Sequence, residues 1–237
     1  MVSASSSSNN LSISELLEKF KASSVRQKRT LTKEVEQRAS EIADLGKEAL
    51  LDFDCDGDDW CAGWILQSLH RHDPDALGDI LANKPSGWFD APSSAGIDFG
   101  PFQEALLQER FEDADRLTSS FLRKLAGQDA EKRGYVYFTE VGFMCDVDLV
   151  TMDRLWVAYS QGRFGFSVQA RLLKALKGSY DRLWPRIGWK TDTGWTRYPS
   201  AFTWSLDAPE GHMPLVNQLR GVRLIHAILN HPSLLDR

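Results

Sequence analysis

The chain has 237 residues, of which 42% are hydrophobic and 26% charged, and its net charge is −5. A chain of this length and composition can bury a normal core and holds one or two domains. No stretch approaches the ~20 uninterrupted apolar residues of a membrane span, and the opening MVSASSSSNN lacks the basic flank and apolar core of a secretory signal. We expect residues 1–10 to form a disordered tail on a cytoplasmic protein that meets membranes at most peripherally.

The first part of the chain has the periodicity of a helical bundle. Apolar residues repeat at three- and four-residue spacing over 13–20 and 31–42, which predicts helices with one buried stripe each. A third helix is predicted over 60–70. An Asp-Pro pair opens a fourth over 73–83, with the aspartate as N-cap and the proline at the first helical position. We expect these helices to form one bundle over residues 11–83.

A break in the pattern separates this bundle from the rest. Residues 84–96, KPSGWFDAPSSAG, are rich in Pro, Gly and Ser and have no periodicity. We place a linker at 84–93 and expect few contacts to cross it. Beyond it, helices are predicted around 102–106 and over 114–125, the latter ending at Gly127 as a C′ residue.

Two more helices and a long irregular segment follow. Asp148 is expected to cap the first helix, and Ser167 the second, which runs to Gly178. The first of these directs a large apolar set inward: Leu149, Met152, Trp156 and Tyr159. Residues 180–214 contain Gly, Pro and Trp with little periodicity, which is typical of functional segments in compact domains. A final helix is predicted over 215–229.

Charge is unevenly distributed along the chain. Residues 157–237 carry 11 Lys and Arg against 5 Asp and Glu, a surplus of 6, so residues 1–156 carry −11. Five of the eight tryptophans lie in or at the edge of this basic third: Trp156, Trp184, Trp189, Trp195 and Trp204. Arginines mixed with aromatic side chains suit a flat anionic ligand, although the same mixture also binds single-stranded nucleic acid.

The predicted final helix carries a polar and basic edge. Asn217, Arg220 and Arg223 recur every third residue beside its apolar stripe. Arginine forks match carboxylates bidentately, so a ligand with two carboxylates would engage both arginines. The alternative is that these arginines pair with the acidic part of the chain or with loop carbonyls, and the pattern alone does not separate the two.

Three motif-like patterns lack residues that their chemistry requires. DFDCDGD at 52–58 opens like a calcium loop, but Gly63 stands at the twelfth position, where a bidentate Glu is needed. Acid and base side chains gather in one loop without a nucleophile or an oxyanion device: Asp207, Glu210 and His212. The three cysteines form neither a CxxC pair nor a disulfide framework, which favours a reducing compartment. We therefore expect no catalytic residue and no metal site.

Four blocks of the second part of the chain carry a family resemblance: YVYFTEV at 135–141, DLVTMDRLWVAYSQGRFGFSVQ at 148–169, RLWPRIGWK at 182–190 and WTRYPSAFTWSLDAPEGHMPLVNQLRGVR at 195–223. They resemble, in the same order, the genomes-uncoupled-four family of tetrapyrrole-binding regulators of magnesium chelatase. The resemblance covers 94–232, and the bundle before it is similar to the extra domain of cyanobacterial members in length and helicity. The chain ends at Arg237 without the long polar extension of plant members, which favours the cyanobacterial type.

The resemblance implies an all-α protein, in which an N-terminal helical bundle is followed by an all-helical, cupped-hand porphyrin-binding domain over 94–237. It implies a non-enzymatic protein without a cofactor of its own. Such a protein binds protoporphyrin IX and magnesium protoporphyrin IX and stimulates magnesium chelatase in chlorophyll biosynthesis through the large porphyrin-binding subunit of that enzyme.

A porphyrin is a broad apolar disc with two propionates on one edge, so it requires an aromatic cup with a basic rim. The cup candidates are Phe138, Trp195, Tyr198 and Phe202, and the rim candidates are Asn217, Arg220 and Arg223. The alternative function is a single-stranded nucleic-acid or peptide binding module that uses the same surface, and the overall acidity of the chain argues against it.

The stretch GRFGFS is expected to belong to the fold. Gly162 and Gly165 permit a turn, Ser167 caps the helix that follows, and Phe164 and Phe166 pack beneath the cup. The alternative is a direct contact with the ligand. A turn and a helix cap explain the spacing without one.

Overall fold

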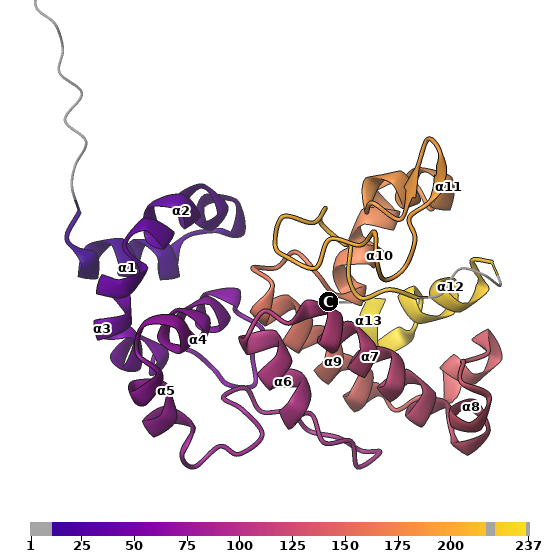
Figure 1. Ribbon diagram of the computed structural model, residues 1–237, viewed down its shortest axis with the longest axis horizontal. Coiled ribbons are helices and arrows are strands. Elements are labelled where there is room, and N and C mark those ends of the chain that lie inside the picture. Colours follow the sequence, from indigo (N-terminus) through magenta and orange to yellow (C-terminus); the bar gives the residue numbers. More distant parts are fainter. Residues whose placement is uncertain (1–10, 217–220, 236–237) are drawn as a thin grey trace, which may run out of the picture.

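The computed structural model describes residues 11–216 and 221–235, and this part of the chain is mostly helical (Figure 1). The expected tail at 1–10 lies outside the described residues. The elements in chain order are α1 Ile13–Ala22, α2 Val25–Gln37, α3 Ala39–Leu50, α4 Trp60–His72, α5 Pro74–Leu81, α6 Gly100–Leu107, α7 Phe111–Ala126, α8 Gln128–Arg133, the 3-10 helix η1 Phe138–Phe143, α9 Asp146–Tyr159, α10 Phe166–Ala175, α11 Tyr180–Arg186, β1 Lys190–Thr191, β2 Gly194–Trp195, α12 Arg223–Leu229 and α13 Pro232–Leu235. The expectation of an all-α fold is confirmed, apart from the small antiparallel pair β1–β2.

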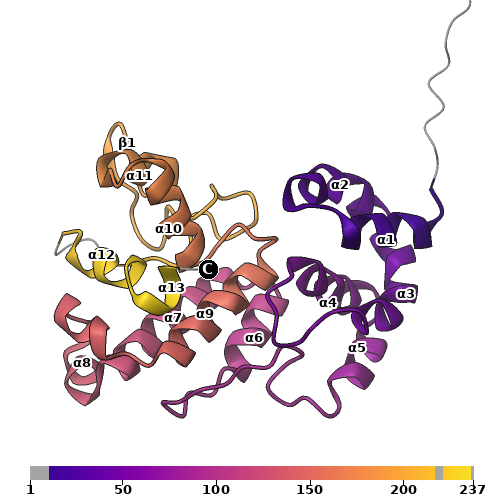
Figure 2. The ribbon, with the colours of Figure 1, turned by 180° about the vertical axis from the view of Figure 1, so that it is seen from behind.

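The helices form two groups, α1–α5 on one side of the molecule and α6–α13 on the other (Figures 1 and 2). Local capping fixes the helix starts in the first group. Ser12 accepts a hydrogen bond from the N–H of Glu15 at 3.3 Å, and Glu15 accepts one from the N–H of Ser12 at 2.8 Å, which is a capping box. Asp73 accepts from the N–H of Ala76 at 3.0 Å, with proline at the first position of α5, so this predicted helix start is confirmed.

Helix α4 joins the two groups. Every residue from Trp60 to Leu69 is buried, because α4 packs on α3 in its own group and on α6 and α9 in the other. The side chain of Gln67 donates to the carbonyls of Leu106 at 3.1 Å and Tyr159 at 2.9 Å. The expectation of few contacts between the two parts is therefore wrong, since α4 packs directly on helices of the second group. The boundaries at 11–83, 84–93 and 94–237 stay a prediction.

Buried side chains of the second group bind the irregular segment after α5, and Gln103 is one of them. Gln103 of α6 donates to the carbonyls of Ser86 and Phe89, both at 2.7 Å, and accepts from the N–H of Phe89 and the hydroxyl of Tyr159, both at 3.2 Å. All hydrogen-bonding positions of this amide are thus occupied by the segment and by the core. The composition predicts the absence of periodicity correctly, but not this attachment.

The acidic turn between α3 and α4 is held from the second group. Arg154 of α9 is buried, and its guanidinium donates to the carbonyls of Cys55 at 3.1 Å and Gly57 at 2.9 Å. In the described residues no cluster of three or more His, Cys, Asp or Glu side chains has the arrangement of a metal site. The turn is therefore attached to the core through its backbone.

The start of α9 differs from the prediction. The helix begins at Asp146, so Asp148 lies inside its first turn and does not cap it. Asp148 is fully buried, and its carboxylate accepts from the hydroxyl of Ser93, the N–H of Ser94 at 3.0 Å and the N–H of Ala95 at 3.2 Å. Its partners lie over 50 residues earlier in the chain, where helical periodicity gives no indication of them. The predicted inward residues of this helix are all buried.

The GRFGFS stretch forms a turn and a helix start, as predicted, but with a different cap. Helix α10 begins at Phe166 with Gly165 at the N-cap, so the expected cap by Ser167 is wrong. Instead, Asp153 of α9 accepts from the N–H of Ser167 at 2.8 Å. Gly165 has φ +134°, and a Cβ there would come within 2.8 Å of the same carboxylate. Both phenylalanines of the stretch are fully buried.

The last predicted helix is shorter than the sequence indicates. Residues 215 and 216 are not helical, and α12 begins only at Arg223. Gly221 has φ +80°, a left-handed conformation that does not continue an α-helix. The predicted helix over 215–229 is therefore wrong outside 223–229 in the described residues. Asn217 and Arg220 lie outside those residues.

Candidate functional site

Two aromatic clusters lie along the segment after α11. In the first, the ring centroids of Trp184 and Trp189 lie 5.6 Å apart and stacked, and Trp195 of β2 lies 5.7 Å from Trp184. Lys190 pairs with Trp195 in the β1–β2 hairpin, and its ammonium lies 5.7 Å from the Trp195 ring. The indole of Trp195 is 54% exposed, so this cluster offers a flat surface to solvent with a cation beside it.

The second cluster contains Tyr198, Phe202 and Trp204. Their ring centroids lie 5.4–5.8 Å from one another, and Phe202 is stacked on Trp204. Phe202 is buried, whereas Tyr198 is 40% exposed. The cluster therefore presents the tyrosine ring to solvent and uses Phe202 as the support beneath it.

A third pair joins η1 to α12. The Arg223 guanidinium lies 5.3 Å from the centroid of the Phe138 ring, within the range of a cation–π contact. Phe138 is the first residue of η1 and is 41% exposed, and Arg223 is the first residue of α12 and exposed. An aromatic face with a cation over it is the combination that a flat apolar anion requires.

The structure thus brings Phe138 to Arg223 and Tyr198 to Phe202, while Trp195 contacts Trp184. Of the four cup candidates, Phe202 is buried and the other three are about half exposed. Asn217 and Arg220, which complete the predicted rim, lie outside the described residues.

Sequence reasoning missed a buried carboxylate beneath the second cluster. Asp115 of α7 is 1% exposed and accepts a hydrogen bond from the N–H of Leu215 at 2.6 Å. Burial raises the pKa of Asp115 to about 7, although the Leu215 N–H and the Tyr198 hydroxyl oppose this by favouring the carboxylate. Its hydrogen-bond partner Leu215 lies 100 residues further along the chain. The sequence shows only an aspartate within an amphipathic helix.

In the loop with acid and base side chains, His212 and Glu210 make contacts that hold the loop in place. His212 is buried, with Nδ1 2.7 Å from the carbonyl oxygen of Ile187 and Nε2 3.3 Å from the backbone N of Thr203. A neutral imidazole protonated at Nδ1 satisfies both contacts, and burial lowers the pKa of this histidine. Glu210 forms an ion pair with Arg171 at 3.1 Å. These contacts hold the loop before α12.

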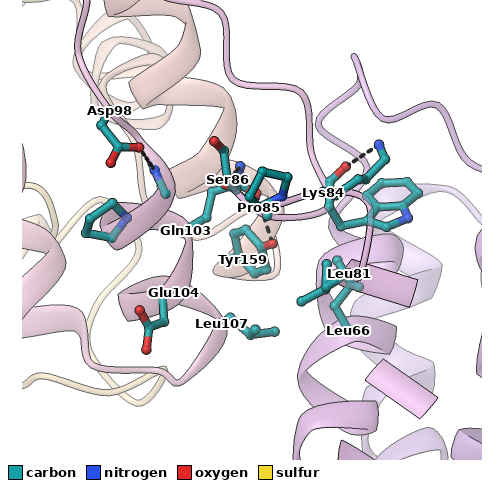
Figure 3. A pocket seen from close by; sticks show the side chains of 14 residues that line it. Leu66, Leu81, Lys84, Pro85, Ser86, Asp98, Gln103, Glu104, Leu107 and Tyr159 are labelled. Atoms are coloured by element: carbon teal, nitrogen blue, oxygen red, sulfur yellow. Dashed lines mark hydrogen bonds between the residues drawn. The ribbon is translucent and has the colours of Figure 1, made fainter. Parts of the chain in front are cut away.

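Two cavities lie away from the aromatic clusters. The larger, of about 530 Å³, lies at the junction of the two helix groups, between Leu66 and Leu81 on one side and Glu104 and Leu107 of α6 on the other (Figure 3). The smaller, of about 460 Å³, is lined mainly by α10, α12 and α13. None of the described candidate residues lines either cavity. The candidate surface is therefore open to solvent.

The described helices were compared with the length and hydropathy of membrane spans. Within residues 11–216 and 221–235, no helix has the length and apolar character needed to cross a bilayer.

Comparison with known proteins agrees with this architecture. Residues 92–232 match the family described as GUN4-like. The Ycf53-like protein of Synechocystis sp. is 46% identical over 171 residues, which are 72% of this chain and 73% of that protein. The chloroplastic tetrapyrrole-binding protein of Arabidopsis thaliana is 37% identical over 144 residues, which are 57% of this chain and 54% of that protein.

Solved structures give the same result. The structure of GUN4 from Chlamydomonas reinhardtii matches with a TM-score of 0.58 at 39% identity, covering 61% of this chain and 95% of that chain. Ligand-free Arabidopsis thaliana GUN4 matches with a TM-score of 0.54 at 34% identity, covering 60% of this chain and 98% of that chain. The family match contains every cup and rim candidate. The resemblance expected from the four sequence blocks is confirmed, and the chain belongs to the GUN4-like family.

Proposed function

We propose that this chain binds protoporphyrin IX and magnesium protoporphyrin IX without transforming them, and stimulates magnesium chelatase in chlorophyll biosynthesis. The observation that carries the proposal is the Arg223 guanidinium over the half-exposed ring of Phe138. A porphyrin needs an apolar surface for its disc and a cation for its propionates, and this pair supplies both. The name of the Arabidopsis relative, a tetrapyrrole-binding protein, supports the same ligand class.

The remaining candidates extend this surface. Trp195 and Tyr198 offer two further half-exposed rings, and Phe202 supports Tyr198 from within. Asn217 and Arg220 precede Arg223 at three-residue spacing, and we assign them to the same basic rim. In this proposal the protein has no cofactor of its own, and the porphyrin is a ligand that it binds without chemical reaction.

The partner that we propose is the large porphyrin-binding subunit of magnesium chelatase. A carrier of this kind works in the cytoplasm of a cyanobacterial cell and meets photosynthetic membranes at most peripherally. Mixing the protein with protoporphyrin, magnesium and the chelatase should raise the rate of magnesium insertion. The protein without chelatase should form no product, and turnover by the protein alone would refute the non-enzymatic role.

Binding itself is tested with deuteroporphyrin IX, a soluble analogue, by following tryptophan fluorescence. We expect saturable quenching, because Trp184, Trp189, Trp195 and Trp204 lie in the clusters beside the proposed surface. No quenching at tens of micromolar ligand contradicts the proposal. Repeating the titration at rising salt separates it from nucleic-acid binding, since phosphate contacts weaken steeply with salt and apolar burial does not.

A further inference from the structure

An ion pair between Arg133 and Glu140 holds the 3-10 helix η1, which begins with Phe138. Nη2 of Arg133 lies 2.9 Å from one carboxylate oxygen of Glu140 and 2.7 Å from the other. The two side chains are only 19% and 24% exposed. Salt screens such a covered pair less than a pair of exposed charges, so its geometry is well maintained in solution.

The carboxylate of Glu140 also reaches back to the start of η1. It accepts a hydrogen bond from the backbone N–H of Tyr137 at 2.7 Å, as the glutamate of a capping box does. Tyr137 directly precedes Phe138 in the chain. The backbone from which the Phe138 ring projects is therefore tied to the carboxylate that Arg133 binds.

Arg133 connects this arrangement to the preceding helix. It is the last residue of α8, and its Nε donates to the carbonyl of Tyr135 at 3.1 Å. Its guanidinium carbon lies 4.8 Å from the ring centroid of Tyr135 and 4.1 Å from that of Tyr137, which are cation–π distances. Because α8 packs on α7, these contacts fix the start of η1 relative to the second helix group.

The partner of Phe138 in the candidate site comes from the opposite direction. Helix α12 packs on η1, and Arg223 at its start places its guanidinium 5.3 Å from the Phe138 ring. A cation–π contact requires the cation to stand over the face of the ring. The direction of the Phe138 ring therefore decides whether an apolar face and a cation are presented together.

We propose that Arg133 and Glu140 are positioning residues of the porphyrin site. They set the direction of the Phe138 ring, so that the porphyrin disc packs on this ring while Arg223 meets a propionate. This inference rests on the proposed porphyrin-binding function. It adds two residues that act on the ligand through Phe138.

The two members of the pair separate a positioning role from a purely electrostatic one. Loss of Glu140 leaves one more positive charge near an anionic ligand, and loss of Arg133 leaves one more negative charge. Electrostatics alone would tighten binding in Glu140→Ala and weaken it in Arg133→Met. A positioning role weakens binding in both variants, because either change releases the start of η1.

The experiment measures deuteroporphyrin IX affinity by tryptophan quenching in the full chain. Glu140→Ala and Arg133→Met should each bind about threefold to tenfold more weakly than wild type, the range that corresponds to one aromatic contact. Glu140→Gln should lie between, since its amide oxygen still accepts from the Tyr137 N–H. The control is Glu41→Ala, which removes an ion pair with Arg38 at 3.0 Å in the N-terminal bundle and should bind like wild type.

A double-mutant cycle with Phe138→Ala tests whether the pair acts through this ring. Glu140→Ala should weaken binding by the wild-type chain and cause no further loss in the Phe138→Ala chain. An equal loss in both chains overturns the proposal, because a general disturbance of the domain does not depend on the ring. Circular dichroism identifies a variant that does not fold, and Glu140→Gln then replaces Glu140→Ala in the same cycle.

The outcomes separate this inference from the function on which it rests. Wild type that binds no porphyrin refutes the proposed function, and this inference with it. Wild-type affinity in both Glu140→Ala and Arg133→Met refutes the positioning role alone. Tighter binding by Glu140→Ala together with weaker binding by Arg133→Met also refutes it, since the pair then affects the ligand only through its charges.

Discussion

Gly63 of α4 lies directly against the carbonyl of Ala158 in α9. A Cβ at position 63 would come within 2.0 Å of that carbonyl oxygen and 2.7 Å of the carbonyl carbon. Both atoms belong to helix backbone, which does not move aside as a flexible side chain would. The absence of a side chain at Gly63 therefore sets how closely the N-terminal bundle approaches the second helix group.

Gly63→Ala should destabilise the protein by forcing these two helices apart. Overpacking a close contact costs about 1–3 kcal/mol, and a contact with rigid backbone belongs at the upper end. The matched control is Gly78→Ala in α5, where nothing lies within 4 Å of the added Cβ. That change should stabilise the protein by about 0.4–1 kcal/mol through the unfolded chain. Urea unfolding of both variants checks the prediction, and equal effects would contradict it.

A fragment of residues 93–237 should fold and bind porphyrin, but with a lower melting temperature than the full chain. It retains every cup and rim candidate, and the Chlamydomonas GUN4 chain is covered to 95% by a match to 61% of this chain. The loss of α4 exposes the faces of α6 and α9 on which it packs. Thermal unfolding measures the melting temperature of the fragment, and the fluorescence titration measures its porphyrin binding. A folded fragment that does not bind would show that the bundle contributes to the site.

Arg223→Ala should weaken deuteroporphyrin binding by about 1–3 kcal/mol, the usual range for a charge-assisted hydrogen bond to a propionate. Arg223→Lys should lie between alanine and wild type, because lysine keeps the charge and loses the planar fork. Arg182→Ala, at an exposed arginine of α11, is the control and should bind normally.

The dimethyl ester of the ligand shows whether Arg223 recognises the propionates. Esterification removes both negative charges and leaves the disc unchanged. Wild type should lose affinity for the ester, and the alanine variant should lose much less. Equal losses in the two proteins would mean that Arg223 supports Phe138 and not the ligand.

The acidic turn at 52–58 should not bind calcium specifically. Gly63 replaces the bidentate acid that a calcium loop needs, and Arg154 already occupies the carbonyls of Cys55 and Gly57. Calorimetric titration with calcium should show no heat of specific binding, and calcium should not change the melting temperature of the protein. A micromolar site that disappears in Asp54→Ala would overturn this expectation.

Asp115 should also make folding stability depend on pH. Its pKa is raised from 3.8 to about 7 by folding, so the folded state binds this proton more tightly than the unfolded state. Its contribution is complete below pH 3.8 and is lost as the pH rises towards 7, by at most about 1.4 kcal/mol per pH unit. The difference in unfolding free energy between wild type and Asp115→Asn should fall over this window. A difference that does not vary with pH would contradict the assignment.

The sequence predicts those features whose causes act within a few residues. Asp73 and Pro74 start α5 and Gly127 ends α7, because each acts through its own backbone neighbours. Buried carboxylates are different. Asp153 caps a helix that begins 13 residues later in the chain, in place of the expected Ser167. Periodicity carries no information about a partner on another element, so such contacts cannot be found from spacing.

The candidate site shows the same division. The residue types of the cup and rim candidates follow from composition and from the family resemblance. Among these candidates, the structure places Phe138 in contact with Arg223 and Tyr198 in contact with Phe202. The helix that was expected to carry the rim does not continue through Gly221. The left-handed backbone conformation of this residue is incompatible with an α-helix, whatever the apolar pattern around it. The stacking of Trp204 on Phe202 and the hydrogen bond from the Leu215 N–H to Asp115 could not be predicted, because both are three-dimensional contacts.

Gln67 has a consequence for how the two helix groups depend on each other. The carbonyls of Leu106 and Tyr159 belong to the last turns of α6 and α9, where an α-helix has no partners of its own for its carbonyl groups. The amide of Gln67 serves as a C-cap for both helices, supplied by a different part of the chain. The Leu106 carbonyl also accepts from the N–H of Glu109 at 3.1 Å, so a relative without the bundle must satisfy chiefly the Tyr159 carbonyl with its own side chains or with water. The bundle therefore completes hydrogen bonding that the second group leaves open.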